Sequence, residues 1–281
     1  MTLFLLTTLA MLAFAANSVL NRMAVGAGLI DPVSYAVIRL AAGAAVLALL
    51  VLGRRVLRGG AVWPGWTGRM AGVTGLLCYL FGFSAAYLTL DAGIGALILF
   101  GSVQITMFAG ALAARDAVSG MRWAGAGLAF GGLVVLVAPG GSIGAFGPVL
   151  LMAFAGFGWG IYSLAGRQTV DPLQATAANF VLALPLALGV AAVIGFGSAL
   201  QPVGILLAIL SGAVTSGLGY ALWYGVLPRL GATRAAVAQL TVPVIAAGAG
   251  AVWLGEGFGL RFAIASALVL GGVALASIAR K

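Results

Sequence analysis

The sequence predicts an all-α polytopic membrane protein in which ten transmembrane helices form two inverted repeats of five helices each. Three observations support this prediction. Long apolar runs follow one another along the chain, the basic residues gather in alternate segments between those runs, and patterns in the first half recur 140 positions later, as when Asp31-Pro32 returns as Asp171-Pro172.

The composition excludes a water-soluble globule. Of the 281 residues, 63% are hydrophobic and only 7% are charged, and the mean hydropathy is +1.19. Polar side chains are therefore too few to cover a molecule in water. In hydrocarbon every backbone N–H and C=O needs an internal partner, which leaves helices or a closed barrel. Unbroken apolar runs favour helices, because barrel strands alternate polar and apolar residues.

Ten apolar runs approach the length of about 20 residues that crosses a bilayer. They cover residues 2–20, 33–53, 70–90, 93–113, 121–138, 146–166, 173–196, 203–226, 235–254 and 262–278. The first run has no basic region before it and no convincing cleavage site, so we expect a retained span and not a signal peptide.

The basic residues predict the orientation, because cytoplasmic loops carry an excess of Arg and Lys. With a cytoplasmic N-terminus, eleven cations fall on the cytoplasmic side, Arg22 and Arg261 fall on the other side, and Arg39 lies inside a span. The eleven are Arg54, Arg55, Arg58, Arg69, Arg115, Arg122, Arg167, Arg229, Arg234, Arg280 and Lys281. We expect a bacterial inner-membrane protein with both termini in the cytoplasm.

The repeat divides the chain into two units. Residues 13–16 (AFAA) recur as 153–156 (AFAG), at the same displacement as the two Asp-Pro pairs. Because each unit holds five spans, the second enters the membrane upside down, as in transporters that alternate access between two sides. The predicted units are 1–138 and 146–281, joined by a linker at 139–145.

Several motifs resemble a known family. They are Arg39 seven positions after Pro32, the hairpin Leu254-Gly255-Glu256 followed by Arg261, and Gly271-Gly272-Val273. With the ten spans and their repeat, the chain resembles, over essentially its whole length, the ten-helix branch of the drug/metabolite transporter (DMT) superfamily, which has two EamA-type repeats. It is similar to aromatic amino-acid exporters of the YddG type. The resemblance implies efflux of amino acids across the bacterial inner membrane.

The acidic residues bear on energy coupling. Asp31, Asp91, Asp116, Asp171 and Glu256 all fall at helix ends or in loops, whereas a carboxylate inside the membrane is the usual proton relay. We therefore expect facilitated transport, and a substrate that is not a simple cation. Each Asp-Pro pair also predicts a helix start, with the aspartate as cap and the proline in the first turn.

Aromatic and polar side chains inside the spans predict the binding site. Tyr79 and Phe83 share a helix face, and Trp159 and Tyr220 lie near mid-membrane, as a cavity for a bulky, weakly polar solute requires. Ordinary helix packing is the alternative. Gln104 and Gln239 either tie helices together or contact a substrate. The candidate substrate-binding residues are Asn17, Tyr79, Phe83, Ser84, Gln104, Trp159, Tyr162, Tyr220 and Gln239.

Three further residues are assigned structural or gating roles. Arg39 lies about 10 Å inside its helix, where a cation is a functional candidate, but its repeat partner Asn179 is also polar, which favours a structural role for both. Pro243 removes a helical hydrogen bond, so we expect it to act as a hinge beside Gly248 and Gly250.

Taken together, these patterns predict an exporter of small metabolites, most of all aromatic and other apolar amino acids, that works by alternating access as a monomer in lipid. Multidrug efflux is the alternative. With no histidine and one cysteine, Cys78, we expect no catalytic residues, metal or cofactor, so an intramembrane enzyme acting on lipid is least favoured. The scattered arginines behind the net charge of +9 do not indicate a nucleic-acid partner.

Overall fold

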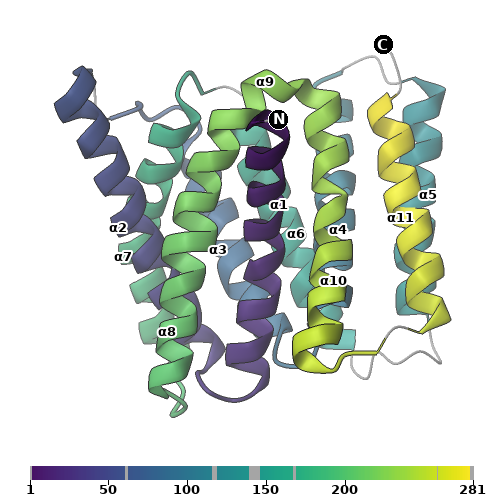
Figure 1. The fold of residues 1–281 in the computed structure, drawn as a ribbon, viewed down its shortest axis with the longest axis horizontal. Helices are drawn as coiled ribbons and strands as arrows, with labels where there is room; N and C mark the ends of the chain where they lie inside the picture. The colour runs from purple at the N-terminus through teal and green to yellow at the C-terminus, as the bar shows by residue number, and fades with distance from the viewer. Residues whose placement is uncertain are drawn as a thin grey trace.

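The computed structural model describes residues 2–60, 63–115, 119–138, 146–166, 169–257 and 259–278, without the side chains of 231–234 and 236. Within these ranges ten helices are long and apolar enough to cross a membrane, which confirms the predicted number. They stand side by side in Figure 1. The predicted linker at 139–145 and Asp116 lie outside the described residues.

The ten membrane spans agree with the predicted apolar runs to within six residues at each end. In chain order the helices are α1 (Thr2–Asn21), η1 (Arg22–Gly26), α2 (Pro32–Arg58), α3 (Arg69–Ala86), α4 (Ala92–Ala113), α5 (Gly120–Val137), α6 (Phe146–Gly166), α7 (Pro172–Ile194), α8 (Pro202–Leu210), η2 (Ser211–Leu218), α9 (Gly219–Gln239), α10 (Thr241–Leu254) and α11 (Leu260–Ile278). The elements η1 and η2 are π-helical.

The region around Pro243 contains an interruption that the sequence did not predict. The ninth span covers Val237–Leu254, close to the predicted 235–254, but one turn residue, Leu240, separates the end of α9 at Gln239 from the start of α10 at Thr241. Pro243 therefore lies in the first turn of α10, where N–H groups have no acceptor inside the helix and a proline removes no bond. The proline that the sequence assigns as a hinge thus lies directly after this turn.

The two Asp-Pro pairs begin α2 and α7, as predicted. Asp31 accepts hydrogen bonds from the N–H groups of Val33 (3.0 Å) and Ser34 (2.9 Å). Asp171 accepts one from the N–H of Gln174 (3.1 Å). In both helices the proline follows at the first position. These caps satisfy N–H groups that a helix leaves free at its start.

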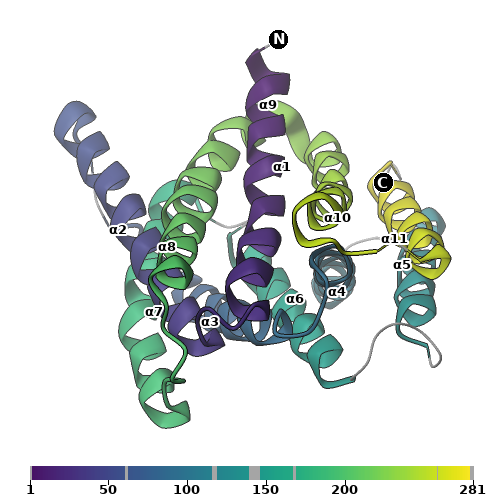
Figure 2. The ribbon, with the colours of Figure 1, turned by 60° about the horizontal axis from the view of Figure 1, so that its bottom comes forward.

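Helix packing follows the pattern that two inverted five-helix units require. Helices α3 and α4 of the first half pack on α6 of the second half. In the corresponding way η2, α9 and α10 of the second half pack on α1 of the first half. The pairs α2 with α7, α4 with α10, and α5 with α11 join equivalent helices of the two halves. Figure 2 places α2 with α7 at one edge of the bundle and α5 with α11 at the other.

Glycines bring α6 close to both of its neighbours. A Cβ on Gly156 would lie 2.7 Å from the Leu99 carbonyl oxygen of α4, and one on Gly158 would lie 2.6 Å from the Gly75 oxygen of α3. Small residues at these positions let the helix backbones approach one another. This close fit holds α6 at the centre of the molecule.

The first and last spans start and finish at the same end of the bundle. The beginning of α1 and the end of α11 both lie at the top of Figure 1, whereas η1 and the α10–α11 connection lie at the bottom. Thr2 and Ile278 are therefore on one face. An even number of crossings requires this arrangement.

Candidate functional site

Trp159 of α6 stands at the centre of an aromatic cluster. Its ring stacks on Tyr162 (centroids 5.0 Å apart) and on Tyr220 of α9 (5.3 Å), and it is tilted against Tyr79 of α3 (5.0 Å). Trp159 is half-buried, whereas the three tyrosines are buried. The structure thus brings together four candidate residues from three helices. The first of them, Tyr79, and the last, Tyr220, are 141 positions apart in the sequence.

The aromatic face of α3 extends this cluster. Tyr79 packs against Phe83 (5.1 Å), and Phe83 packs edge-on against Tyr87 (4.8 Å). The predicted helix face with i, i+4 spacing is therefore confirmed. On the other side, Tyr220 contacts Phe14 of α1 (5.6 Å) and Phe180 of α7 (5.9 Å). The rings form a continuous wall through the middle of the bundle.

Arg39 of α2 is fully buried beside this wall. Its Nη2 donates a hydrogen bond to the Tyr79 hydroxyl (2.7 Å) and its Nε donates one to the Ser216 hydroxyl of η2 (3.2 Å). The guanidinium carbon lies 5.1 Å from the ring centroids of both Tyr79 and Phe83, within cation–π range. Arg39 therefore does not reach the surface, as a snorkelling side chain would.

Asn17 connects α1 to the π-helical segment η2. Its Oδ1 accepts hydrogen bonds from Ser211 (2.8 Å), Thr215 and Ser216 (3.4 Å). The wider turn of a π-helix, a feature often found at functional sites, directs three hydroxyls towards one amide. Since Ser216 also accepts from Arg39, a chain of hydrogen bonds links α1, η2, α2 and α3.

Two other candidates tie helices together away from the rings. Ser84 of α3 is buried and accepts a hydrogen bond from Asn21 of α1 (3.2 Å). Asn179 of α7 is buried and accepts one from Nη1 of Arg69 (2.8 Å), which also donates to the Ala175 carbonyl (2.6 Å). Both side chains therefore join neighbouring helices by hydrogen bonds.

Three predicted residues do not join the cluster. Gln104 of α4 and Gln239 at the end of α9 are half-buried, and neither side chain forms a hydrogen bond within the described ranges. Pro243 is buried in the first turn of α10. In the described part of the chain, no three His, Cys, Asp or Glu side chains come together as a metal site requires.

Sequence reasoning missed several residues of the site. Ser211, Thr215 and Ser216 were not predicted, although hydroxyls within an apolar span are a usable signal. Arg69 was assigned to a cytoplasmic loop as an orientation signal, but it is the first residue of α3 and is buried. Its partners come from α7, more than 100 residues further along the chain, so no local pattern reveals them.

At the face that carries Arg22, several contacts join the two halves. Both oxygens of Glu256 accept from the Ala92 N–H (2.9 Å each), and Arg22 lies 3.5 Å from Glu256 and 3.8 Å from Asp91. An antiparallel bridge also pairs Ile30 with Leu200. We call Arg22, Asp91 and Glu256 the ionic latch.

The electrostatics of the latch are those of a partly buried carboxylate. Burial raises the pKa of Glu256 above its ordinary value, and nearby Asp91 adds to this, while the Ala92 N–H and Arg22 act in the opposite direction. At the opposite face Arg54 forms an ion pair with Asp171. Each described acid thus lies at an end of the bundle, as predicted.

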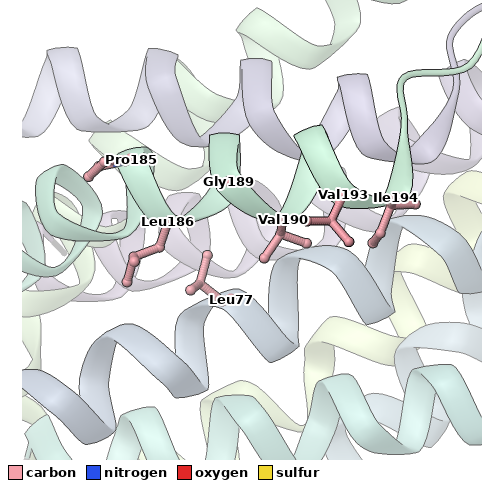
Figure 3. Close-up of a pocket in the computed structure, with 7 residues that line it drawn as sticks. All are labelled: Leu77, Pro185, Leu186, Gly189, Val190, Val193 and Ile194. Carbon is pink, nitrogen blue, oxygen red and sulfur yellow. The ribbon is translucent and has the colours of Figure 1, made fainter.

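An apolar groove runs along the outside of the bundle between α3 and α7. Figure 3 shows Leu77 of α3 opposite six residues of α7, and the groove has a volume of about 530 Å³. The six are Pro185, Leu186, Gly189, Val190, Val193 and Ile194. Leu186, Val193 and Ile194 are exposed, so the groove belongs to the outer surface and not to the central cluster.

The fold and the site define a class: a multi-pass integral membrane protein whose buried polar and aromatic groups gather between its two halves. Residues 147–278 match the EamA-like transporter family. Residues 147–278 thus belong to the EamA-like transporter family, which indicates a membrane transporter of small molecules.

Two known proteins resemble the whole chain. An uncharacterized protein of Pseudomonas aeruginosa, PA1977, is 46% identical over 275 residues, which cover 96% of this chain and 93% of that protein. A protein solved as a crystal structure matches with a TM-score of 0.68 at 20% identity, covering 97% of this chain and 98% of its own. The second likeness shows the shared fold alone.

Proposed function

We propose that this transporter carries small amphipathic solutes with an aromatic or apolar body, amino acids foremost, through the cluster around Trp159. One observation carries the proposal. Four rings from α3, α6 and α9 meet beside buried hydrogen-bonding groups, at the junction of helices from both halves. Such a combination of apolar walls and a few polar groups suits a solute of this kind.

The proposed mechanism is alternating access without a proton-coupling carboxylate. Residues 1–138 and 146–281 act as two inverted units that rock around the central cluster. The acids of the described ranges lie at the ends of the bundle, where they cap helices or pair with arginines. Transport then follows the substrate gradient.

The proposed setting is the bacterial inner membrane, with both termini in the cytoplasm and export as the direction of flux. The distribution of cations supports this orientation, because among the described arginines Arg22 and Arg261 alone fall on the face opposite Thr2 and Ile278. The packing of all ten spans into one bundle is consistent with a monomer.

The decisive experiment is counterflow in proteoliposomes. Vesicles loaded with unlabelled tryptophan should accumulate labelled tryptophan without an imposed pH gradient, whereas empty vesicles should not. A requirement for a pH gradient would overturn the facilitative mechanism. Failure of every amino acid in the same assay would overturn the amino-acid substrate.

The lateral groove favours a second candidate function, efflux of lipophilic compounds. Its seven lining residues are all apolar and lie where a compound dissolved in lipid would approach α3 and α7. Competition separates the candidates: an amino-acid carrier keeps its tryptophan counterflow in the presence of lipophilic cations, whereas a multidrug carrier loses it.

A further inference from the structure

Arg39 carries a charge that the described protein does not neutralise. The side chain is 0% exposed, and it forms no ion pair with any residue of the described ranges. Two of its three nitrogens donate to neutral hydroxyls, those of Tyr79 and Ser216. The third, Nη1, is buried and has no hydrogen-bond partner.

A buried guanidinium in this position is costly. A charge inside a bilayer costs at least about 2.5 kcal/mol on insertion scales, and such residues normally pair with an opposite charge. The cation–π contacts with Tyr79 and Phe83 offset only part of this cost. The four described acids are engaged at the ends of the bundle, so none of them neutralises Arg39.

We infer that Arg39 binds the carboxylate of the transported solute through Nη1, an inference that rests on the proposed function. A guanidinium and a carboxylate form charge-assisted hydrogen bonds that are stronger than neutral ones. A single arginine is neutralised by one negative charge, whereas a doubly charged phosphate ester would leave a net charge buried. The chemistry therefore selects a monocarboxylate.

The position of Arg39 also orients the bound solute. Tyr79 is shared by both parts of the site: its hydroxyl accepts from Arg39, and its ring packs against Trp159. A solute with its carboxylate on Nη1 therefore places its apolar body against the rings of Trp159 and Tyr220. This selects aromatic carboxylates and disfavours aromatic amines, whose ammonium would face a like charge.

Three indole probes of different charge test the inference. Isothermal titration calorimetry on the purified full chain would measure the dissociation constants of indole-3-acetate, tryptophan and tryptamine. We expect indole-3-acetate and tryptophan to bind more tightly than tryptamine. Arg39→Gln should weaken binding of both carboxylates at least about tenfold and leave tryptamine unchanged or bound more tightly. Arg39→Lys should fall between, because an ammonium lacks the planar fork of arginine.

Arg69→Gln is the matched control, since Arg69 is also buried but has protein partners for its Nη1. This variant should change the dissociation constants of all three probes in parallel. If Arg39→Gln does not fold, the affinities of Arg39→Lys for the probes and the order of the wild-type affinities test the inference instead. Equal affinities for the three probes, lowered in parallel by the Arg39 variants, would overturn the Arg39 assignment and leave the proposed function standing. Binding of none of the probes would overturn both.

Discussion

At the scale of single residues, the candidate site depends most on the side chain of Trp159. Its ring contacts three tyrosines, yet it is only half-buried. A residue that served packing alone would be expected to be fully enclosed by its neighbours. The remaining exposed surface of the ring is available to a solute that enters between α3, α6 and α9.

Replacing Trp159 with alanine should weaken binding of tryptophan roughly tenfold, because one aromatic stacking contact contributes about 0.5–1.5 kcal/mol beyond the area it buries. Trp159→Phe should lose less, since a smaller ring remains. Trp253→Phe is the control, because Trp253 is 70% exposed on the outer surface of α10. Calorimetry would measure the affinities. An unchanged affinity in Trp159→Ala would assign the ring to packing.

At the scale of helices, close contacts between α5 and α11 depend on one of two adjacent glycines. A Cβ on Gly272 would lie 2.5 Å from the Gly125 carbonyl oxygen and 2.6 Å from the Ala129 nitrogen. Both are backbone atoms, which cannot move aside alone. A Cβ on Gly271 would meet only a Leu128 methyl group at 4.0 Å.

Gly272→Ala should therefore destabilise the protein, by about 1–3 kcal/mol for an overpacked contact. Gly271→Ala should be neutral or stabilising, because alanine is favoured over glycine in a helix by about 1 kcal/mol. Thermal unfolding of the two variants in the same detergent would compare them directly. Equal melting temperatures would mean that the crossing of α5 and α11 is looser than described.

The ionic latch acts between elements, because Glu256 of the α10–α11 connection caps the start of α4. Burial raises the pKa of Glu256 in the folded protein above its ordinary value, which the group regains in the unfolded chain. Between those two pKa values the folded protein binds more protons than the unfolded chain. Lowering the pH through this range therefore stabilises the fold.

The direction of this pH dependence can be tested with the Glu256→Gln variant. The melting temperature of the wild-type protein should rise, relative to that of Glu256→Gln, as the pH falls from about 7 to about 5. The amide of the variant does not titrate, so the difference reports the carboxyl group. Asp91→Asn removes a charge that helps to raise this pKa, so it should make the difference smaller. A difference that falls on acidification would contradict the assignment of the raised pKa to Glu256.

At the scale of the whole molecule, ten crossings place the beginning of α1 and the end of α11 on one face. In a Cys78→Ala background, cysteines introduced at Thr2 and Ile278 should react with a membrane-impermeant maleimide from the cytoplasmic side alone. A cysteine at Leu200, which is exposed in the α7–α8 connection, should react from the other side. Labelling of Thr2→Cys and Ile278→Cys from opposite sides would contradict the even number of crossings.

Sequence patterns were enough to predict the ten spans, the helix starts at Asp31 and Asp171 and the aromatic face of α3. These features depend on hydropathy, on capping and on residue spacing within one helix, all of which are local. The folded structure was needed to show that Arg39 lies against Tyr79 and Ser216, that Arg69 of α3 is buried against α7, and that Glu256 caps α4. Those partners lie between 40 and 177 residues apart, and which of them meet depends on how the two halves pack.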